Sequence, residues 1–388
     1  MALTRKLRFG MVGGGPGAFI GAVHRRAATL DGLADLVAGA FSSDPDKSRA
    51  QGRELHLDSR RVYDGYEAMA EREAALPATE RIDFVSVVTP NHVHFRAAKA
   101  FIERGIHVIC DKPMTTTLED AEALSQLVRK HDVVFALTHN YTGYPLVKQA
   151  RAFVSAGELG PVRKVVAEYS QGWLSTLVES TGQKQAGWRT DPARAGAGAL
   201  GDIGSHAEHL ARYVTGLEIE RLCADVSTFV EGRRIDDDAN ILLRYRGGAK
   251  GVLFCSQISV GEENRLSLRV YGTEGSLEWQ QQEPNVLIVR RANMPMQVYK
   301  PGHPFLAPAA QHATRLPSGH PEAFFEAFAN VYANAMRTIA ARLAGETPDP
   351  LDLDFPTVDD GCAGVRFILG ALASGRGGTW IEMKGSNL

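Results

Sequence analysis

The chain has 388 residues, of which 44% are hydrophobic and 23% are charged. That length exceeds one ordinary hydrophobic core and predicts two domains, and the composition is typical of a globular protein. Lys and Arg total 43 and Asp and Glu total 45, for a net charge of -2. This balance argues against a nucleic-acid or anionic-membrane surface, and no apolar run approaches the length of a membrane span.

The first part of the chain, residues 1–142, alternates between apolar strands and helices. Strands are expected over 7–12, 35–41, 81–90, 106–110 and 132–140, and helical segments over the later part of 13–30, 63–76, 91–105 and 117–131. The strands are continuously apolar, as strands buried on both faces are. The pattern predicts an α/β domain with a parallel sheet covered by helices on both sides.

The first expected strand runs into a glycine-rich turn, GGGPGA, that includes Pro16. Read as G-x-G-x-x-A, Gly13 permits the tight turn, Gly15 lets a pyrophosphate approach the backbone, and Ala18 allows close packing of helix on strand. The following helix offers free N–H groups to phosphates. Alone, the motif also fits an ordinary turn with positive φ. Its place at the first strand of an alternating domain favours dinucleotide binding.

The end of the second expected strand bears on the choice between NAD and NADP. In dinucleotide-binding domains an acid at this place binds the adenosine ribose. Here Ser42 occupies the position, and Asp44 comes two residues later. No arginine stands beside Ser42 to bind a 2′-phosphate, and the nearest cations, Lys47 and Arg49, fall in the following helix. The sequence therefore favours NAD and leaves NADP open.

Polar residues follow the third strand in the segment TPNHVH, at the edge where such domains bind ligands. We expect Thr89 and Pro90 to pack by the nicotinamide ribose, and Asn91 and His94 to hydrogen-bond it. The alternative is a helix cap by Asn91 with an exposed His94.

A lysine lies between an acid and a proline where the fourth strand ends, as Asp111-Lys112-Pro113. Proline fixes its own φ and restrains the residue before it, so the backbone aims Lys112. The four cysteines, Cys110, Cys223, Cys255 and Cys362, form no CxxC pair. They are typical of reduced, mostly buried thiols in a cytoplasmic protein.

The second part of the chain, 143–388, changes to strands with period-two alternation and Gly-containing turns. Strands are expected over 161–172, 221–232, 238–248, 249–261, 264–281 and 284–292, with a hairpin at 271–276 and terminal helices over 321–345 and 357–375. This predicts an α+β domain with a large, mainly antiparallel open sheet. One face is expected to pack on helices or on the first domain, and the other to form a subunit interface.

A Gly- and Ala-rich run leads into a second polar stretch, GDIGSHAEH. A helix expected from about Asp202 places Asp202, His206 and His209 on one face. Three interpretations stay open. Asp202 caps the helix and pairs with His206; or the three residues bind zinc, although no fourth ligand is evident; or His206 is a general base oriented by Asp202. A Ser-His-Asp hydrolase is disfavoured because no G-x-S-x-G elbow precedes a helix.

The glycine turn, CDKP and GDIGSHAEH, in this order, resemble the Gfo/Idh/MocA family of sugar and polyol dehydrogenases over nearly the whole chain. The resemblance implies an N-terminal Rossmann domain that binds NAD(P) and a C-terminal domain that receives a sugar, inositol or related polyol. Lys112 matches the lysine of the family's E/D-K-P motif, and Asp202 and His206 match its D-x-x-x-H pair. The family often has Asp where this chain has His209, which puts the pattern of hydrogen bonds to the substrate in doubt.

The resemblance implies oxidation of a CH–OH group of a sugar, glycoside or inositol to a keto group, and it also allows the reverse reaction, reduction of a keto-sugar. His206 would take the hydroxyl proton, Lys112 would stabilise the developing alkoxide charge, and Asp202 would orient His206 or bind a neighbouring hydroxyl. Further candidate contacts to substrate or cofactor are Asn140, Tyr141, Lys184, Trp188, Arg189 and Asp111. For Trp188 the alternative is packing at a domain interface.

Two other functions remain open. A non-catalytic dinucleotide sensor should have lost the lysine or the histidine, and this chain keeps both Lys112 and His206. An oxidoreductase could also recycle a tightly bound cofactor with a second substrate. A homodimer or homotetramer through the C-terminal sheet is expected, with no metal, nucleic-acid or membrane partner.

Overall fold

The computed structural model describes residues 5–383, which divide into two compact units. Within the described residues, the first unit comprises 5–115, Glu119–Gly143 and Phe324–Cys362. The second comprises Thr116–Leu118, Tyr144–Ala323 and 363–383.

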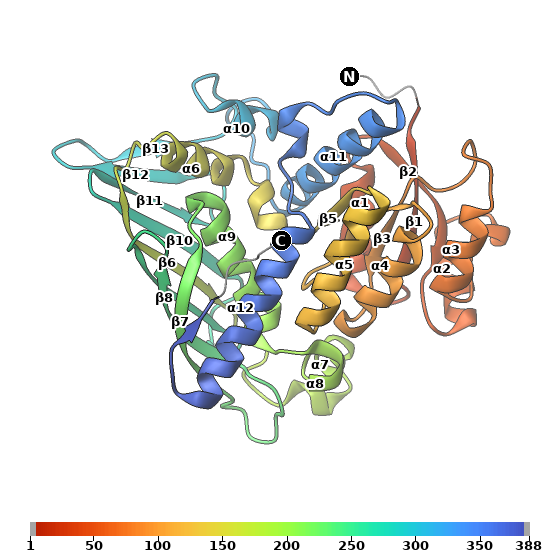
Figure 1. The fold of residues 1–388 in the computed structure, drawn as a ribbon, viewed down its shortest axis with the longest axis horizontal. Helices are drawn as coiled ribbons and strands as arrows, with labels where there is room; N and C mark the ends of the chain where they lie inside the picture. Colours follow the sequence, from red (N-terminus) through yellow and green to blue (C-terminus); the bar gives the residue numbers. More distant parts are fainter. Residues whose placement is uncertain (1–4, 384–388) are drawn as a thin grey trace. The chain divides into compact units, whose positions relative to one another are not determined.

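The first unit is built on a five-stranded parallel sheet in the order β2-β1-β3-β4-β5 (Figure 1). Its strands are β1 (Leu7–Gly13), β2 (Ala34–Ala40), β3 (Phe84–Val88), β4 (His107–Cys110) and β5 (Phe135–Leu137). Helices alternate with them: α1 (Phe19–Thr29), α2 (Pro45–Glu54), α3 (Tyr66–Ala74), α4 (His94–Ile102) and α5 (Leu118–His131). The predicted parallel α/β domain is confirmed, and it is a Rossmann-type fold.

Helices cover both faces of this sheet. α1 packs with α11 (Phe324–Leu343), whereas α3 packs with α4. Right-handed crossovers place helices on opposite faces when the strand order runs in opposite directions from β1. Phe328, Tyr332 and Met336 recur every four residues on α11 and are buried in a core shared with β1 and α1.

The strand order reverses between β1 and β3, which pair with Gly13 opposite Val88. Open α/β sheets bind ligands beside the carboxyl ends of strands at such a reversal. The glycine turn after β1, Thr89 after β3 and Lys112 after β4 therefore share one edge of the sheet.

The second unit contains a nine-stranded sheet in the order β13-β12-β11-β10-β6-β9-β8-β7-β14 (Figure 1). Its strands are β6 (Val162–Ser170), β7 (Ile219–Ser227), β8 (Asp238–Tyr245), β9 (Lys250–Ser256), β10 (Arg265–Gly272), β11 (Gly275–Gln280), β12 (Leu287–Arg291), β13 (Gln297–Tyr299) and β14 (Ile381–Glu382). Every pair is antiparallel except β6 with β9. The large, mainly antiparallel sheet is confirmed, and Tyr271 pairs with Ser276 in the predicted hairpin. The short edge strands β13 and β14 were not predicted.

Helices α6 (Pro145–Ser155) and α9 (Ser205–Thr215) pack together and lie against this sheet. The remaining helices are α7 (Lys184–Arg189), α8 (Pro192–Ala195), α10 (Pro308–His312) and α12 (Val358–Gly377). Side chains alternate along β8, so Leu243 is buried whereas Leu242 is 52% exposed. The outer face of the sheet thus carries apolar side chains in contact with solvent.

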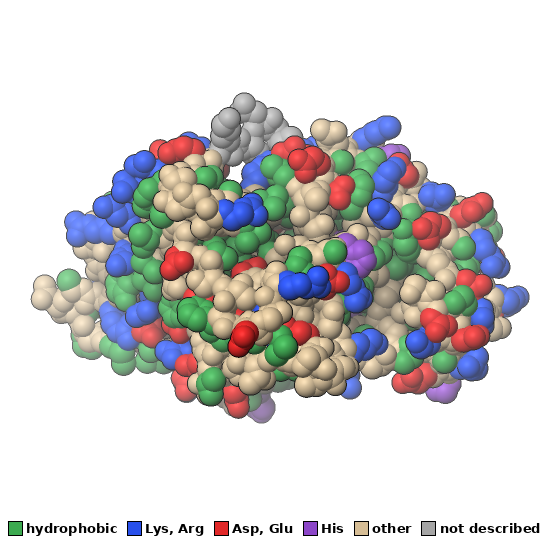
Figure 2. Space-filling model, turned by 90° about the horizontal axis from the view of Figure 1, so that it is seen from below, with side chains coloured by type: hydrophobic (Ala, Val, Ile, Leu, Met, Phe, Trp, Pro, Cys, Tyr) green, Lys and Arg blue, Asp and Glu red, His purple; other side chains and the backbone are tan. Residues whose placement is uncertain are grey.

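Within residues 5–383, no helix has the length and apolarity that a membrane crossing requires. Basic and acidic side chains are interspersed on the surface drawn in Figure 2, as the near-neutral net charge predicts. All four cysteines are free, and Cys110, Cys255 and Cys362 are buried.

Candidate active site

The glycine turn after β1 requires its glycines. Gly13, Gly14 and Gly17 have φ of 85°, 70° and 74°, a region that side chains disfavour. A Cβ on Gly13 would lie 2.6 Å from the Val88 carbonyl oxygen, and one on Gly15 would lie 2.6 Å from that of Phe41. A larger residue at either position would therefore collide with the backbone of Val88 or Phe41, so the turn keeps this shape only with glycine.

Helix α1 begins directly after this turn, with Ala18 at its N-cap position and no described side chain capping it. Pro16 is exposed and Ala18 is half-buried. The tightest contact between helix and turn is made by Gly21, where a Cβ would lie 2.4 Å from Gly14 Cα. Sequence reasoning missed Gly14 and Gly21, although a glycine inside an expected helix indicates close packing.

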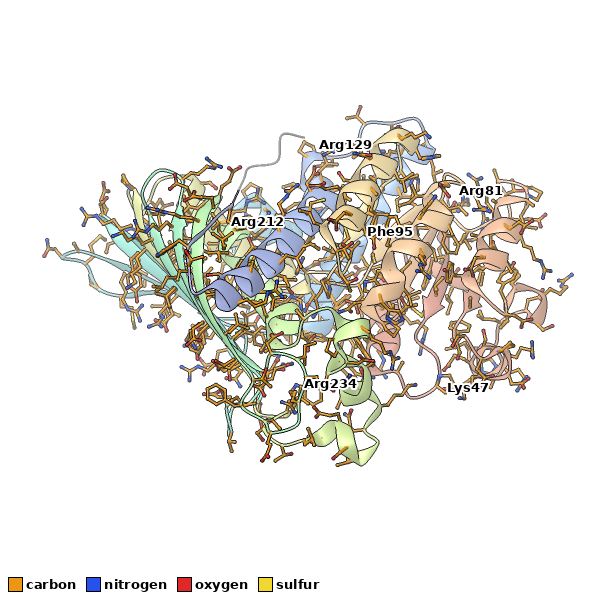
Figure 3. All side chains as sticks on the ribbon, turned by 60° about the horizontal axis from the view of Figure 1, so that its bottom comes forward. Lys47, Arg81, Phe95, Arg129, Arg212 and Arg234 are labelled. Atoms are coloured by element: carbon orange, nitrogen blue, oxygen red, sulfur yellow. The ribbon has the colours of Figure 1, made fainter. Side chains whose placement is uncertain are left out.

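The residues after β2 are engaged with one another. Ser42 Oγ accepts a hydrogen bond from Asp44 N at 3.1 Å, and Asp44 caps α2 through Asp46 N and Lys47 N. Arg49 pairs with Asp46 and Asp64, while Lys47, labelled in Figure 3, pairs with Asp44 at 3.3 Å. Both nearby cations are thus paired with acids.

Thr89 and His94 form the site edge after β3. Thr89 Oγ1 is buried and has no hydrogen-bond partner among the described residues. His94 is fully buried, with Nδ1 2.8 Å from Pro113 O and Nε2 2.8 Å from Thr89 O. Burial lowers the pKa of His94 despite the opposing charge of Asp111. The alternative of an exposed His94 is therefore wrong, because the imidazole ties the β3 loop to the turn that follows Lys112.

The neighbouring residues of the TPNHVH segment are also placed. Asn91 is buried and starts the 3-10 helix η2 (Asn91–Val93), with Pro90 at its N-cap position. Asn91 does not itself occupy the cap position that the alternative interpretation gave it.

Lys112 is half-buried on the turn that follows β4, and its peptide bond to Pro113 is cis. Asp111 holds this turn. Its N–H donates to Val87 O at 2.9 Å, and its Oδ1 accepts from Lys112 N at 2.8 Å and Thr138 Oγ1 at 3.2 Å. The Asp111 carboxylate therefore shapes the backbone that carries Lys112.

A buried polar chain behind Asp111 was missed by sequence reasoning. His24 Nε2 of α1 lies 3.8 Å from Asp111 Oδ2, and His24 Nδ1 lies 2.7 Å from the hydroxyl of Tyr332. That hydroxyl is 2.9 Å from Ser86 Oγ. Burial lowers the pKa of His24 to about 4, so the imidazole is neutral. A histidine in the middle of an apolar helix was the only available signal.

Asn140 and Tyr141 lie on η3 (Asn140–Gly143), just after β5, and both are buried. The amide nitrogen of Asn140 has no hydrogen-bond partner within the described residues. Like Thr89 Oγ1, it is a buried polar group without a hydrogen-bond partner at the carboxyl edge of the sheet, within the described residues.

These features fit a dinucleotide. The glycine turn leads directly into α1, whose first N–H groups have no described side-chain cap and can bind a pyrophosphate. Unsatisfied polar atoms of Thr89 and Asn140 suit a polar ligand at the same edge. The first unit would therefore hold NAD through the turn after β1 and the ends of β3, β4 and β5.

In the second unit, Asp202 lies on a π-helical turn, η5 (Leu200–Gly204), that leads into α9. Such turns often mark functional sites. His206 and His209 follow on α9, with 7% and 2% of their surface exposed. The His206 ring lies 6.2 Å from that of Tyr169, and the His209 ring 6.3 Å from that of Tyr213. No group of side chains arranged as a metal site occurs within residues 5–383.

Arg189 is brought to Asp202, with Arg189 Nε 3.4 Å from Asp202 Oδ2. Its guanidinium also lies 4.4 Å from the Trp188 ring. Trp188 is half-buried and Lys184 is exposed, both on α7. The structure thus gathers Arg189 with Asp202 and leaves Lys184 at the surface.

Asp236, before β8, fixes the approach to Asp202. Its carboxylate accepts hydrogen bonds from Gly198 N at 2.7 Å and Leu200 N at 2.8 Å. Burial raises the pKa of Asp236, and these two hydrogen bonds oppose the rise. Gly198 packs so closely that a Cβ would lie 1.9 Å from Asp236 O.

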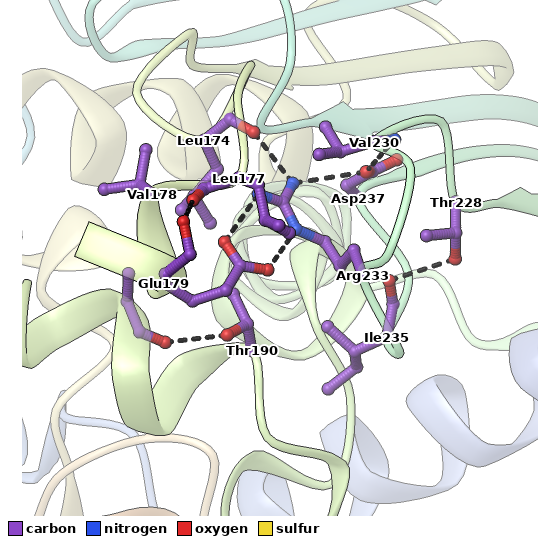
Figure 4. A network of polar contacts seen from close by, with 12 residues as sticks. Leu174, Leu177, Val178, Glu179, Thr190, Thr228, Val230, Arg233, Ile235 and Asp237 are labelled. Atoms are coloured by element: carbon purple, nitrogen blue, oxygen red, sulfur yellow. Dashed lines mark hydrogen bonds and ion pairs between the residues drawn. The ribbon is translucent and has the colours of Figure 1, made fainter. Parts of the chain in front are cut away.

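Arg233 fixes the loop after β6 (Figure 4). Its fully buried guanidinium donates to Glu179, to the carbonyls of Leu174 and Thr176, and to Asp237. All five guanidinium N–H groups therefore have acceptors. Sequence reasoning missed Arg233, Asp236 and Asp237, for which the charged run RRIDDD was the visible signal.

Comparison with known proteins gives matches to both parts of the chain. Residues 7–139 match the family described as an oxidoreductase family with an NAD-binding Rossmann fold. Residues 147–278 match the GFO/IDH/MocA C-terminal domain. The chain belongs to the Gfo/Idh/MocA oxidoreductase family.

Two similar proteins match nearly the whole chain, and a third matches 70% of it. The uncharacterized oxidoreductase YfiI of Bacillus subtilis is 32% identical over 98% of each chain. An inositol dehydrogenase homolog from Azotobacter vinelandii, solved with NAD+, is 37% identical with a TM-score of 0.92 over 98% of each chain. The same homolog with NADH and myo-inositol gives 36%, 0.91 and the same coverage. Levoglucosan dehydrogenase of Pseudarthrobacter phenanthrenivorans is 28% identical over 70% of this chain and 73% of that one. This Gfo/Idh/MocA chain is an oxidoreductase with an NAD-binding Rossmann domain.

Proposed function

We propose that this protein oxidises a secondary alcohol of a cyclic polyol or sugar with NAD, giving the keto compound. The similarity to the inositol dehydrogenase homolog solved with NADH and myo-inositol supports this substrate class, because it extends over 98% of the chain. The observation that carries the proposal is the anchoring of Lys112. Asp111 and His94 hold its turn at the carboxyl edge of the NAD-binding sheet.

Each of three side chains has a separate proposed role in the reaction. His206 takes the proton of the reacting hydroxyl, and Asp202 orients His206 or binds a neighbouring hydroxyl. The Lys112 ammonium donates a hydrogen bond to the same oxygen and stabilises its developing negative charge. NAD, when bound, supplies the acceptor for the electron pair that leaves the carbon. Asn140, Tyr141 and His209 are proposed to contact the remaining hydroxyl groups.

NAD is proposed over NADP because Lys47 and Arg49 are paired with acids and no other cation follows Ser42 directly. Asp111, Pro90, Asn91, Trp188 and Arg189 are proposed to line the cofactor site. His94 was expected to hydrogen-bond the nicotinamide ribose, but it is fully buried with both ring nitrogens engaged by backbone carbonyls, so it supports the site without contacting the cofactor. A rival role, a dinucleotide sensor without catalysis, is disfavoured because both Lys112 and His206 are present.

We also propose that the protein is cytoplasmic and forms a homodimer or homotetramer through the outer face of the nine-stranded sheet. Leu242 is 52% exposed there, and an open apolar sheet face is a typical subunit contact. Sedimentation of wild type and Leu242→Asp tests the assembly, and the proposal requires that the charge shift the protein toward monomer.

The function is tested by incubating the protein with a panel of inositols, pyranoses and glycosides and either NAD or NADP. NADH formation is followed by its near-ultraviolet absorbance. Turnover of at least one cyclic polyol or sugar with NAD is expected. Tight NAD binding without turnover of any member would instead support the sensor.

A further inference from the structure

A chain of polar side chains runs from Asp202 across the second unit. Gln257 Nε2 donates to Asp202 Oδ2 at 2.9 Å and lies 3.5 Å from Gln171 Oε1. Gln171 Nε2 then donates to Asn264 Oδ1 at 2.7 Å. These hydrogen bonds thus join the turn η5, which carries Asp202, to the residues that follow β6 and β9 and the residue that precedes β10.

Two aromatic residues complete the chain. The Trp173 indole N–H donates to Gln171 Oε1 at 3.0 Å, and the Tyr169 hydroxyl donates to Asn264 Oδ1 at 2.7 Å. The Tyr169 ring in turn lies 6.2 Å from the His206 ring. At one end of this series of hydrogen bonds, Gln257 binds Asp202. At the other end, the Tyr169 ring lies near the imidazole of His206.

The sheet explains why two glutamines lie side by side. β6 and β9 form the sheet's parallel pair, with Ser170 opposite Ser256. Gln171 and Gln257 follow these serines, and Gln171 N donates to Ser256 O at 2.8 Å. The matching Ser-Gln pairs at two strand ends are the sequence signal for this arrangement.

The hydrogen-bonding groups of Asp202 and Trp173 determine how the side-chain amides of Gln257 and Gln171 are oriented. An ionised carboxylate only accepts and an indole only donates. Gln257 must therefore present its nitrogen to Asp202, and Gln171 must present its oxygen to Trp173. The nitrogen of Gln171 is then left to donate to Asn264. Gln257 is 2% exposed, so a wrong orientation would bury an unsatisfied polar group.

Building on the proposed function, we propose that Gln257 and Gln171 are positioning residues for the Asp202 and His206 pair. Gln257 fixes the carboxylate of Asp202 by a hydrogen bond. Gln171 donates a hydrogen bond to Asn264, which accepts one from the Tyr169 hydroxyl. This fixes the Tyr169 ring, which packs near the His206 ring. Neither glutamine needs to touch substrate for this role.

The test uses Gln257→Leu, which keeps the size of the side chain and removes the donor. Gln282→Leu, at an exposed position, is the matched control. Gln257→Met, which has a similar length and also lacks a donor, serves if the leucine variant folds poorly. For the sugar with the highest turnover, kcat should fall about 10- to 100-fold, the size expected for losing a hydrogen bond to a charged group. The dissociation constant for NAD should stay unchanged.

A second readout does not depend on activity. The indole N–H signal of Trp173, assigned by its loss in Trp173→Phe, is followed by NMR in substrate-free protein. It should shift in the Gln257 variants and stay fixed in Gln282→Leu. An unmoved signal overturns the network, whatever happens to kcat, and an unchanged kcat with altered NAD binding overturns the positioning role. A shifted signal in a protein that oxidises no sugar upholds the network and refutes the proposed function.

Discussion

At the residue scale, the two side chains proposed to act on the substrate hydroxyl, Lys112 and His206, are held in place by different kinds of contact. Lys112 is held by a turn that Asp111 and His94 both brace. His206 lies buried on α9 beside Tyr169. The identities of these residues were predictable because lysine before proline and histidine after a glycine run are visible in the sequence. Their braces were not, since His24, Tyr332 and Gln257 are brought close only by tertiary packing.

Lys112→Ala should abolish detectable turnover and largely preserve NAD binding. The ammonium would stabilise charge that develops only during reaction, and removal of one such donor costs on the order of 100- to 1,000-fold in kcat. Steady-state kinetics and fluorescence titration with NAD measure the two effects. Lys130→Ala, exposed at the end of α5, is the control. Full activity of Lys112→Ala would refute its role.

His206→Ala should lose most activity, and part of the loss should be relieved at high pH. The substrate hydroxyl ionises more readily there, so a general base is needed less. The measurement is kcat against pH for wild type, His206→Ala and the exposed-position control His320→Ala. A variant profile equal to that of wild type would remove the assignment of His206 as the base.

Buried His24 should make stability depend on pH. Its pKa is lowered by burial from 6.5 to about 4. Between pH 6.5 and 4, His24 is therefore protonated in the unfolded chain and stays neutral in the folded protein. Stability is therefore complete above pH 6.5 and is lost as pH falls toward 4, by roughly 3 kcal/mol from this group. Urea unfolding across this range should show a smaller loss in His24→Gln than in wild type. Equal losses would contradict the buried neutral imidazole, and His320→Gln should behave as wild type.

At the element scale, the sequence predicted the parallel sheet, the antiparallel sheet and the hairpin, because buried parallel strands are continuously apolar and half-buried strands alternate. It did not predict β13 and β14, which have three and two residues, too few for a period to register. Nor did it indicate that α11 packs on α1, since an apolar helical face shows that the helix is buried but not which element it packs against.

The loop after β6 should depend on Arg233 (Figure 4). Arg233→Ala leaves Asp237 and Glu179 without their buried partner, at a cost of about 3–5 kcal/mol. Urea unfolding measures this loss, and limited proteolysis should cleave near 174–181 sooner. The neighbouring Arg234, whose side chain is 73% exposed and which is labelled in Figure 3, provides the control variant Arg234→Ala. Equal stability of the two variants would show that the network does not hold this loop.

At the scale of the whole molecule, each unit supplies one part of the proposed chemistry. The first carries the glycine turn and Lys112, and the second carries Asp202 and His206. A member of this family that keeps both the glycine turn with Lys112 and the pair Asp202 and His206 is expected to be an active dehydrogenase. Which sugar it oxidises depends on side chains from many segments that have no common sequence pattern. For that reason substrate class follows from similarity and chemistry, while the particular polyol has to be found by assay.

The central claim is that Lys112 and His206 act on one hydroxyl group. The most direct measurement is a crystal structure of the protein with NAD and the polyol that it oxidises. We expect the Lys112 ammonium and a ring nitrogen of His206 both to lie within hydrogen-bond distance of the same substrate oxygen. Finding the two side chains in separate cavities, or either one turned away from the nicotinamide, would contradict it.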